Sequence, residues 1–337
     1  MEIDFNQINS GNYIKIAKAA GLKYYDEFIE VLNILKPYLS EKQLKDILEN
    51  KLLFKYNNFD KNKFIQHAVE LSVLRFFAEN FGEHFQYEKK SNPNNNTDVD
   101  CSFSDGKFKF NIEVKTPILD KKDINISPGM KGRSLGRLPD GLFEGITKTL
   151  DKALNLPKGS SNIVNFDNKL KQFLIDANKK FNPQSNNSEN EANILIIGLD
   201  DIKEIMIWIN YLENAGNGGL FTLNSFCDPK EYESVDFVVF TNLYFKHKNA
   251  ITDKCQNHWD LKHNFVMMYN NPMTDPKKRD VLEHFLKLCP NYNNEVDEFE
   301  VQIDEPDSMN RLFKLKFFVE NELERKRGIY LFEKQSQ

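Results

Sequence analysis

The sequence has few cysteines and tryptophans and no long apolar run. Its four cysteines include no CxxC pair, so neither a zinc ribbon nor a redox dithiol is indicated. No apolar stretch approaches the ~18 residues that a membrane-spanning helix requires. The N-terminus does not resemble a secretory leader. We therefore expect a cytoplasmic protein whose thiols are reduced.

An excess of basic residues is also absent. The 337 residues include 45 Lys and Arg against 50 Asp and Glu, which gives a formal net charge of -5. Proteins that bind nucleic acid over a broad surface are usually basic, so the composition argues against such broad binding. A local basic groove remains compatible with it, because steering depends on the local field. What the chain does have is a hydrophobic fraction of 40%, including 28 phenylalanines, which is enough for a real core.

The spacing of apolar residues predicts both helices and strands along the chain. Helices are expected at residues 13–20, 25–35, 40–53, 60–80, 139–154, 165–180, 201–213 and 277–288. Strands are expected at residues 85–89, 98–103, 108–115, 193–198, 235–241 and 265–269. Residues 120–141 and 291–308 are expected to be loops, and residues 309–334 fit either a helix or a strand. The order helix, three strands, helix, strand predicts an α/β core with a mixed sheet.

A hairpin is predicted around the dipeptide Asp105-Gly106, which is a strong signal for a two-residue turn. With this dipeptide as the loop, the register sets Asp98 opposite Glu113. A bulge or extra residues in the loop would favour Asp100 in its place. Both aspartates therefore remain candidates.

Polar side chains of this hairpin share one face, because side chains alternate along each strand. Both aspartates face the same side as Glu113 and Lys115, and cross-strand neighbours have Cβ atoms about 5 Å apart. Adjacent carboxylates repel unless a cation lies between them, and such oxygen ligands suit Mg²⁺. A lysine beside them can orient or deprotonate water and offset charge on a phosphate. The hairpin therefore predicts a metal site suited to phosphodiester hydrolysis.

Residues 97–117, TDVDCSFSDGKFKFNIEVKTP, resemble the core hairpin of the PD-(D/E)XK nuclease superfamily. Residues 113–115 match its ExK element, and either Asp98 or Asp100 matches the upstream aspartate. Glu70, an acid in the middle of the preceding helix, is placed similarly to the helix acid of archaeal Holliday junction resolvases in that superfamily. The resemblance covers about residues 60–200, and Thr97 stands where many members have proline.

The resemblance implies a restriction endonuclease-like mixed sheet flanked by helices. Its parts would be a helical N-terminal section (1–58), a nuclease-like domain (59–290) and a C-terminal extension (291–337). The cofactor implied is Mg²⁺ or Mn²⁺, and the ligands implied are Asp98, Asp100, Glu113 and the carbonyl oxygen of Val114. The catalytic residues implied are Asp98, Asp100, Glu113, Lys115 and Glu70.

The implied activity is that of a metal-dependent DNA endonuclease in restriction or defence, acting as a homodimer or in a larger complex. Cations in the loop that follows the ExK element are candidates for binding substrate: Lys131, Arg133 and Arg137, interspersed with glycines that let a backbone approach phosphate. A solvated, flexible loop is the alternative for this segment.

Two rival interpretations remain for the chain as a whole. One is a catalytically inactive nuclease fold that binds nucleic acid or protein within a larger assembly, which the acidic composition favours. The other is a structural α/β protein whose ExK sequence is an accident on the surface, since Glu and Lys are common residues.

Overall fold

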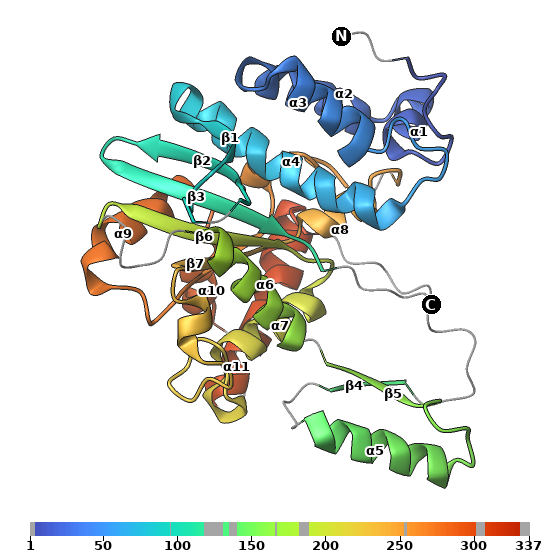
Figure 1. Ribbon diagram of the computed structural model, residues 1–337, viewed down its shortest axis with the longest axis vertical. Coiled ribbons are helices and arrows are strands. Elements are labelled where there is room, and N and C mark those ends of the chain that lie inside the picture. The colour runs from blue at the N-terminus through green and yellow to red at the C-terminus, as the bar shows by residue number, and fades with distance from the viewer. Residues whose placement is uncertain are drawn as a thin grey trace.

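The computed structural model is an α/β structure with a six-stranded mixed sheet and helices on both faces (Figure 1). It describes residues 4–94, 96–117, 131–134, 140–165, 167–181, 189–252, 255–300 and 307–330. Within these ranges, no helix combines the length and the apolar character needed to cross a membrane.

The sheet contains antiparallel strands at its two edges and parallel strands in the middle. Its order is β1 (Gln86–Lys89), β2 (Val99–Asp105), β3 (Phe108–Lys115), β6 (Glu191–Gly198), β7 (Phe237–Thr241) and β8 (Val266–Asn270). β1, β2 and β3 are antiparallel, β3, β6 and β7 are parallel, and β8 returns antiparallel. Every residue of β6 is buried, as expected for a parallel strand covered on both faces.

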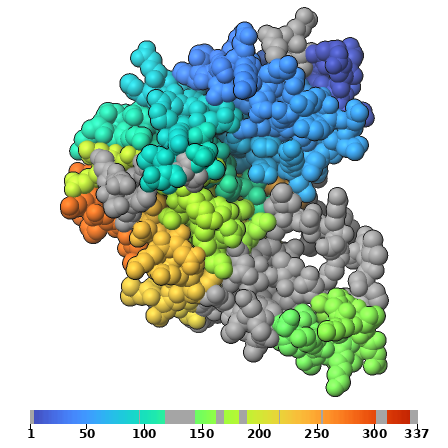
Figure 2. Space-filling model, viewed as in Figure 1, coloured from blue at the N-terminus to red at the C-terminus, as the bar shows by residue number. Residues whose placement is uncertain are grey.

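Helices of the N-terminal section cover one face of the sheet together with a long helix. They are α1 (Tyr13–Ala20), α2 (Lys23–Leu35), α3 (Glu41–Asp46), a π-helical turn (Ile47–Lys51) and α4 (Lys61–Phe81), and α8 (Leu243–Lys248) and α9 (Arg279–Leu288) add to this layer. The capping box of Ser40 and Gln43 and the N-cap of Asp60 on α4 are confirmed. α1 and α2 share one hydrophobic core with α4 and the strands β1–β3. In Figure 2 the dark blue N-terminal residues lie directly against the lighter blue residues that follow them in the chain. The N-terminal helices before residue 58 therefore have no hydrophobic core separate from that of the residues that follow.

The second face of the sheet is covered by α6 (Asp167–Lys180), α7 (Ile202–Glu213) and the C-terminal helices. The latter are α10 (Asn293–Glu298), α11 (Asp307–Phe318) and a π-helical segment (Val319–Arg327). The prediction of a loop at residues 291–308 was wrong where α10 forms, because Val296 alone supplies its buried contact and leaves no apolar period to detect. The ambiguous C-terminal segment is helical over residues 307–327.

A small two-stranded sheet lies in the stretch between β3 and α6. β4 (Lys131–Ser134) pairs in parallel with β5 (Asn162–Asn165), and α5 (Asp140–Ala153) connects them. The prediction of an uninterrupted loop at residues 120–141 was therefore wrong at β4. Its pairing partner comes about thirty residues later in the chain, and such pairing leaves no local signal in the sequence.

Candidate active site

The β2–β3 hairpin forms as predicted, but its register differs by two residues from the expected one. Asp105 pairs with Phe108, so the loop is Gly106 and Lys107 instead of Asp105 and Gly106. Gly106 has φ +59° at the first loop position, a conformation that glycine adopts without a steric penalty. Glycine suits either position of a two-residue hairpin loop, depending on the turn type. The dipeptide therefore predicts the turn but does not fix the register.

The observed register selects Asp100 as the partner of Glu113. Cys101 pairs with Ile112, and the next position sets Asp100 opposite Glu113. Asp98, which the expected register favoured, precedes β2 and is exposed. The structure therefore has the second of the two expected registers, with Asp100 opposite Glu113. Asp98 lies outside this acid pair.

Glu113 is fully buried and is contacted by two lysines. The Nζ atom of Lys115 lies 2.7 Å from its Oε1 atom. Lys180, the last residue of α6, has its Nζ atom 2.7 Å from Oε1 and 2.9 Å from Oε2. Although both ammonium groups are close to Oε1, neither directs a good hydrogen bond at this atom. Lys180 was missed by the sequence analysis, because its place depends on how α6 packs on the sheet.

Asp100 occupies an environment that disfavours its charge. Burial raises the pKa of its carboxyl well above the usual value, and the nearby charges of Glu113 and Glu70 raise it further. Its Oδ2 atom accepts a hydrogen bond of 2.6 Å from the backbone N–H of Val114. A cation beside this carboxyl would favour its ionised form. A divalent cation bound here would therefore stabilise the ionised carboxylate of Asp100.

Lys115 is held as a cation by its carboxylate neighbour. Burial acts to lower the pKa of its ammonium, but the charge of Glu113 outweighs burial and the pKa is raised. In this arrangement Lys115 can stabilise negative charge, whereas removing a proton from water would first require the loss of its own proton.

Glu70 lies on α4, which packs on the face of the sheet opposite to the one covered by α6. Its Oε1 atom lies 2.7 Å from Nζ of Lys51, and its Oε2 atom lies 3.0 Å from Nδ1 of His67. Burial acts to raise the pKa of Glu70, but the hydrogen bond from His67 and the charge of Lys51 lower it to about 2. Glu70 is therefore an anion near the acid pair whose two oxygens are already engaged.

Close packing of α4 on the sheet brings Glu70 towards the carboxyl end of β3. A Cβ atom added to Gly198, the last residue of β6, would lie 2.8 Å from Cγ1 of Val69 and 3.1 Å from Cγ2 of Thr116. Only a residue without a side chain permits this approach. Gly198 thus sets the distance between the helix that carries Glu70 and the strand that carries Lys115.

The predicted substrate-binding cations are only partly located. Lys131 and Arg133 lie on β4, but their side chains fall outside the described residues. Arg137 lies outside the described residues altogether. Their role stays a prediction.

The hairpin supplies two carboxylate side chains that could contact a divalent cation. Among the residues that the structure describes, no group of three or more His, Cys, Asp or Glu side chains is arranged to hold a metal ion. Asp100 and Glu113 supply carboxylate oxygens from opposite strands, and Oε1 of Glu113 is buried without a well-directed hydrogen bond. Mg²⁺ is often held by one or two carboxylates while it keeps several waters. The acid pair fits that type of site and does not fit a cage made only of protein ligands.

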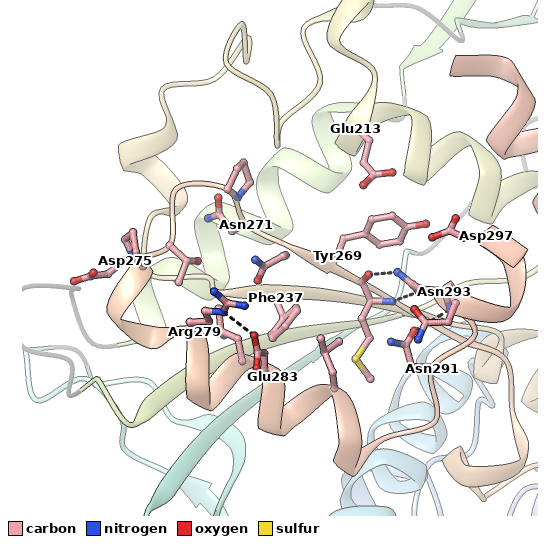
Figure 3. A pocket seen from close by; sticks show the side chains of 18 of the residues that line it. Glu213, Phe237, Tyr269, Asn271, Asp275, Arg279, Glu283, Asn291, Asn293 and Asp297 are labelled. Carbon is pink, nitrogen blue, oxygen red and sulfur yellow. Dashed lines mark hydrogen bonds and ion pairs between the residues drawn. The ribbon is translucent and has the colours of Figure 1, made fainter. Parts of the chain in front are cut away.

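A cavity of about 670 Å³ lies elsewhere, between β8, α9 and α10 (Figure 3). Four carboxylates and two guanidinium groups line it, and Arg279 and Arg311 are already paired with Glu283 and Glu213. This excess of acids would repel a polyanion. We therefore do not assign nucleic acid to this cavity.

Comparisons with known proteins give no relative for the chain. No protein-family model, no curated protein and no solved structure matches it.

Proposed function

We propose that this chain is a metal-dependent nuclease with a restriction endonuclease-like core, most simply a DNA endonuclease of restriction or defence. The observation that carries the proposal is the pairing of Asp100 with a fully buried Glu113, beside the ammonium of Lys115. Burying a carboxylate is costly unless cations or hydrogen bonds compensate it. A fully buried Glu113 paired with a half-buried Asp100 and adjacent lysines is more readily explained by a functional site than by a role in folding alone.

Each residue has a distinct role in this proposal. Asp100 and Glu113 would hold Mg²⁺ or Mn²⁺, with the carbonyl oxygen of Val114 as a further ligand. The metal would polarise a phosphodiester and favour ionisation of an attacking water. Lys115 stabilises the negative charge that develops on the phosphate, and the fixed anion Glu70 stabilises cations bound at the acid pair.

The topology supports the same proposal. α4 is followed by the three antiparallel strands β1–β3, then by β4, α5 and β5, and then by α6 and by β6, which lies parallel to β3. The order helix, three strands, helix, strand predicted an α/β core with a mixed sheet, and it is compatible with the restriction endonuclease-like core that the resemblance implies, with the acid pair where β2 and β3 meet. Because a fold alone does not establish activity, the proposal rests on the acids and lysines of the hairpin.

A catalytically inactive nuclease fold is the second candidate. The ion pairs of Glu113 with Lys115 and Lys180 favour it, because they can neutralise the carboxylate without a metal. The third interpretation, an ExK sequence exposed on the surface, is wrong in its premise, since Glu113 is fully buried.

A cleavage assay distinguishes enzyme from binding module. Purified protein is incubated with plasmid, linear and branched DNA, and with RNA, in parallel with Mg²⁺, Mn²⁺ and EDTA. The proposal predicts cleavage of at least one substrate with either metal and none with EDTA. Binding without cleavage under every metal condition would favour the inactive module.

A further inference from the structure

Lys180 is the feature of the site that the proposed function does not yet use. Its ammonium contacts both oxygens of Glu113, at 2.7 and 2.9 Å. Its side chain retains 21% exposure, whereas Glu113 has none. Lys180 therefore lies between the buried acid and the solvent.

The position of Lys180 is fixed by the packing of the end of α6. The side-chain amide of Asn92 donates to the carbonyl oxygen of Lys179, and the side-chain oxygen of Asn178 accepts from the backbone N–H of Ser234. Phe181, directly after Lys180, is fully buried. These contacts hold the backbone on both sides of Lys180, so its direction towards Glu113 is built into the fold.

Two ammonium groups share one carboxylate oxygen, which is more positive charge than Glu113 alone requires. Nζ of Lys115 and Nζ of Lys180 each lie 2.7 Å from the same Oε1 atom. Two ammonium groups gathered at one oxygen repel each other, and a further anion beside them relieves the repulsion. A phosphodiester carries one negative charge, and attack by hydroxide adds a second. The two lysines thus match the charge of a phosphodiester undergoing hydrolysis.

We propose that Lys180 is a second catalytic lysine: when a divalent metal engages Glu113, the Lys180 ammonium binds a non-bridging oxygen of the phosphodiester. This inference rests on the proposed function. In this proposal the ion pair does more than neutralise Glu113. The Glu113 carboxylate holds the Lys180 ammonium in place until the ammonium binds the phosphate of a substrate.

The inference predicts two opposite effects of the same substitution. Lys180→Met removes a cation that competes for Glu113, so the affinity for Mn²⁺ should rise about tenfold, the effect of a modest Coulomb term. The same variant should lose about 10²-fold in the single-turnover rate on DNA at saturating Mn²⁺, because a stabiliser of developing charge is gone. Lys179→Met is the matched control, since Lys179 is 62% exposed and contacts Asp176. It should change neither quantity.

Calorimetry with Mn²⁺ alone and single-turnover cleavage of a linear duplex test this on the same preparations. Higher affinity with an unchanged rate would reduce Lys180 to a counter-ion and overturn the inference. Lower affinity together with a lower rate would show a structural role and overturn it as well. Lys180→Gln serves if the Met variant does not fold; it also removes the positive charge and should show the same two effects, and a wild-type rate overturns the inference. Absence of Mn²⁺ binding by the wild type would remove the proposed function itself, and the inference with it.

Discussion

Asp100 lies opposite Glu113 across the β2–β3 pair, one position beyond the pairing of Cys101 with Ile112. This relationship predicts which aspartate matters for cleavage. Asp100→Asn should reduce the single-turnover rate by roughly 10² or more, because a metal-binding carboxylate is lost. Asp98→Asn is the matched control on an exposed residue of the same segment and should cleave like the wild type. Loss of activity in the Asp98 variant alone would contradict the assignment.

Lys115 should matter more for chemistry than for binding. Lys115→Ala should lower the single-turnover rate by roughly 10², the scale of losing one charge stabiliser. DNA affinity, measured by filter binding, should fall only modestly, with a slightly shallower salt dependence. Lys115→Arg should restore the rate only in part, because the guanidinium is larger.

Lys109→Ala is the control for Lys115. Lys109 lies on the same face of β3, where its Nζ atom is 2.8 Å from Glu191. Its loss should leave the rate unchanged. Equal rates for wild type and Lys115→Ala would show that the ExK resemblance does not describe the chemistry.

Gly198 should be sensitive to the smallest substitution. The new Cβ of Gly198→Ala would meet Val69 at 2.8 Å in the core, so α4 must shift. We expect a loss of about 1–3 kcal/mol in the free energy of unfolding, as for other overpacked cores. Denaturant melts of Gly198→Ala, of Val69→Ala and of the double variant test this, since the double variant frees the space but loses the buried Val69 side chain. The double variant should lose less than the sum of the two single losses, and a loss equal to that sum or larger would contradict the proposed clash. Gly145→Ala, where no atom lies within 4 Å of the new Cβ, should not destabilise.

Glu204, in the first turn of α7, should make stability depend on pH. Burial raises the pKa of its carboxyl from 4.5 to about 8. Between these values the folded chain holds a proton that the unfolded chain has lost. The free energy of unfolding therefore falls as pH rises, and the loss is complete above pH 8. The charged and titratable groups around it are Asp200, Asp201, Lys248, Tyr244 and Tyr330.

Chemical denaturation between pH 4.5 and 9 measures this effect. Over this range, titration of Glu204 should lower the free energy of unfolding of the wild type by up to ~4 kcal/mol, at 1.36 kcal/mol per pKa unit. Glu204→Gln should lack that contribution, while its amide oxygen can still accept the Asp200 backbone N–H. Glu231→Gln changes an exposed acid and should follow the wild type. Parallel curves for wild type and Glu204→Gln would show that the buried carboxyl does not titrate in this range.

Local signals in the sequence were sufficient for part of the fold and of the site. Ser40, Asp60 and the alternation on both sides of the turn predicted a capping box, an N-cap and the hairpin, because each depends on neighbours within a few residues. The register was not predictable, since Gly106 suits either loop position. Lys180 was not predictable either, because it lies 67 residues from Glu113 and reaches it only through the packing of α6.

Binding of a divalent metal by the acid pair is the central claim, and calorimetric titration with Mn²⁺ measures it directly. Glu113→Gln keeps the size of the side chain and removes the charge that holds a cation at Asp100. The wild type should bind about one Mn²⁺ per chain through one or two carboxylates, and Glu113→Gln should show no measurable binding. Equal affinity in the two proteins would contradict the account, because the metal would then be held somewhere other than the hairpin.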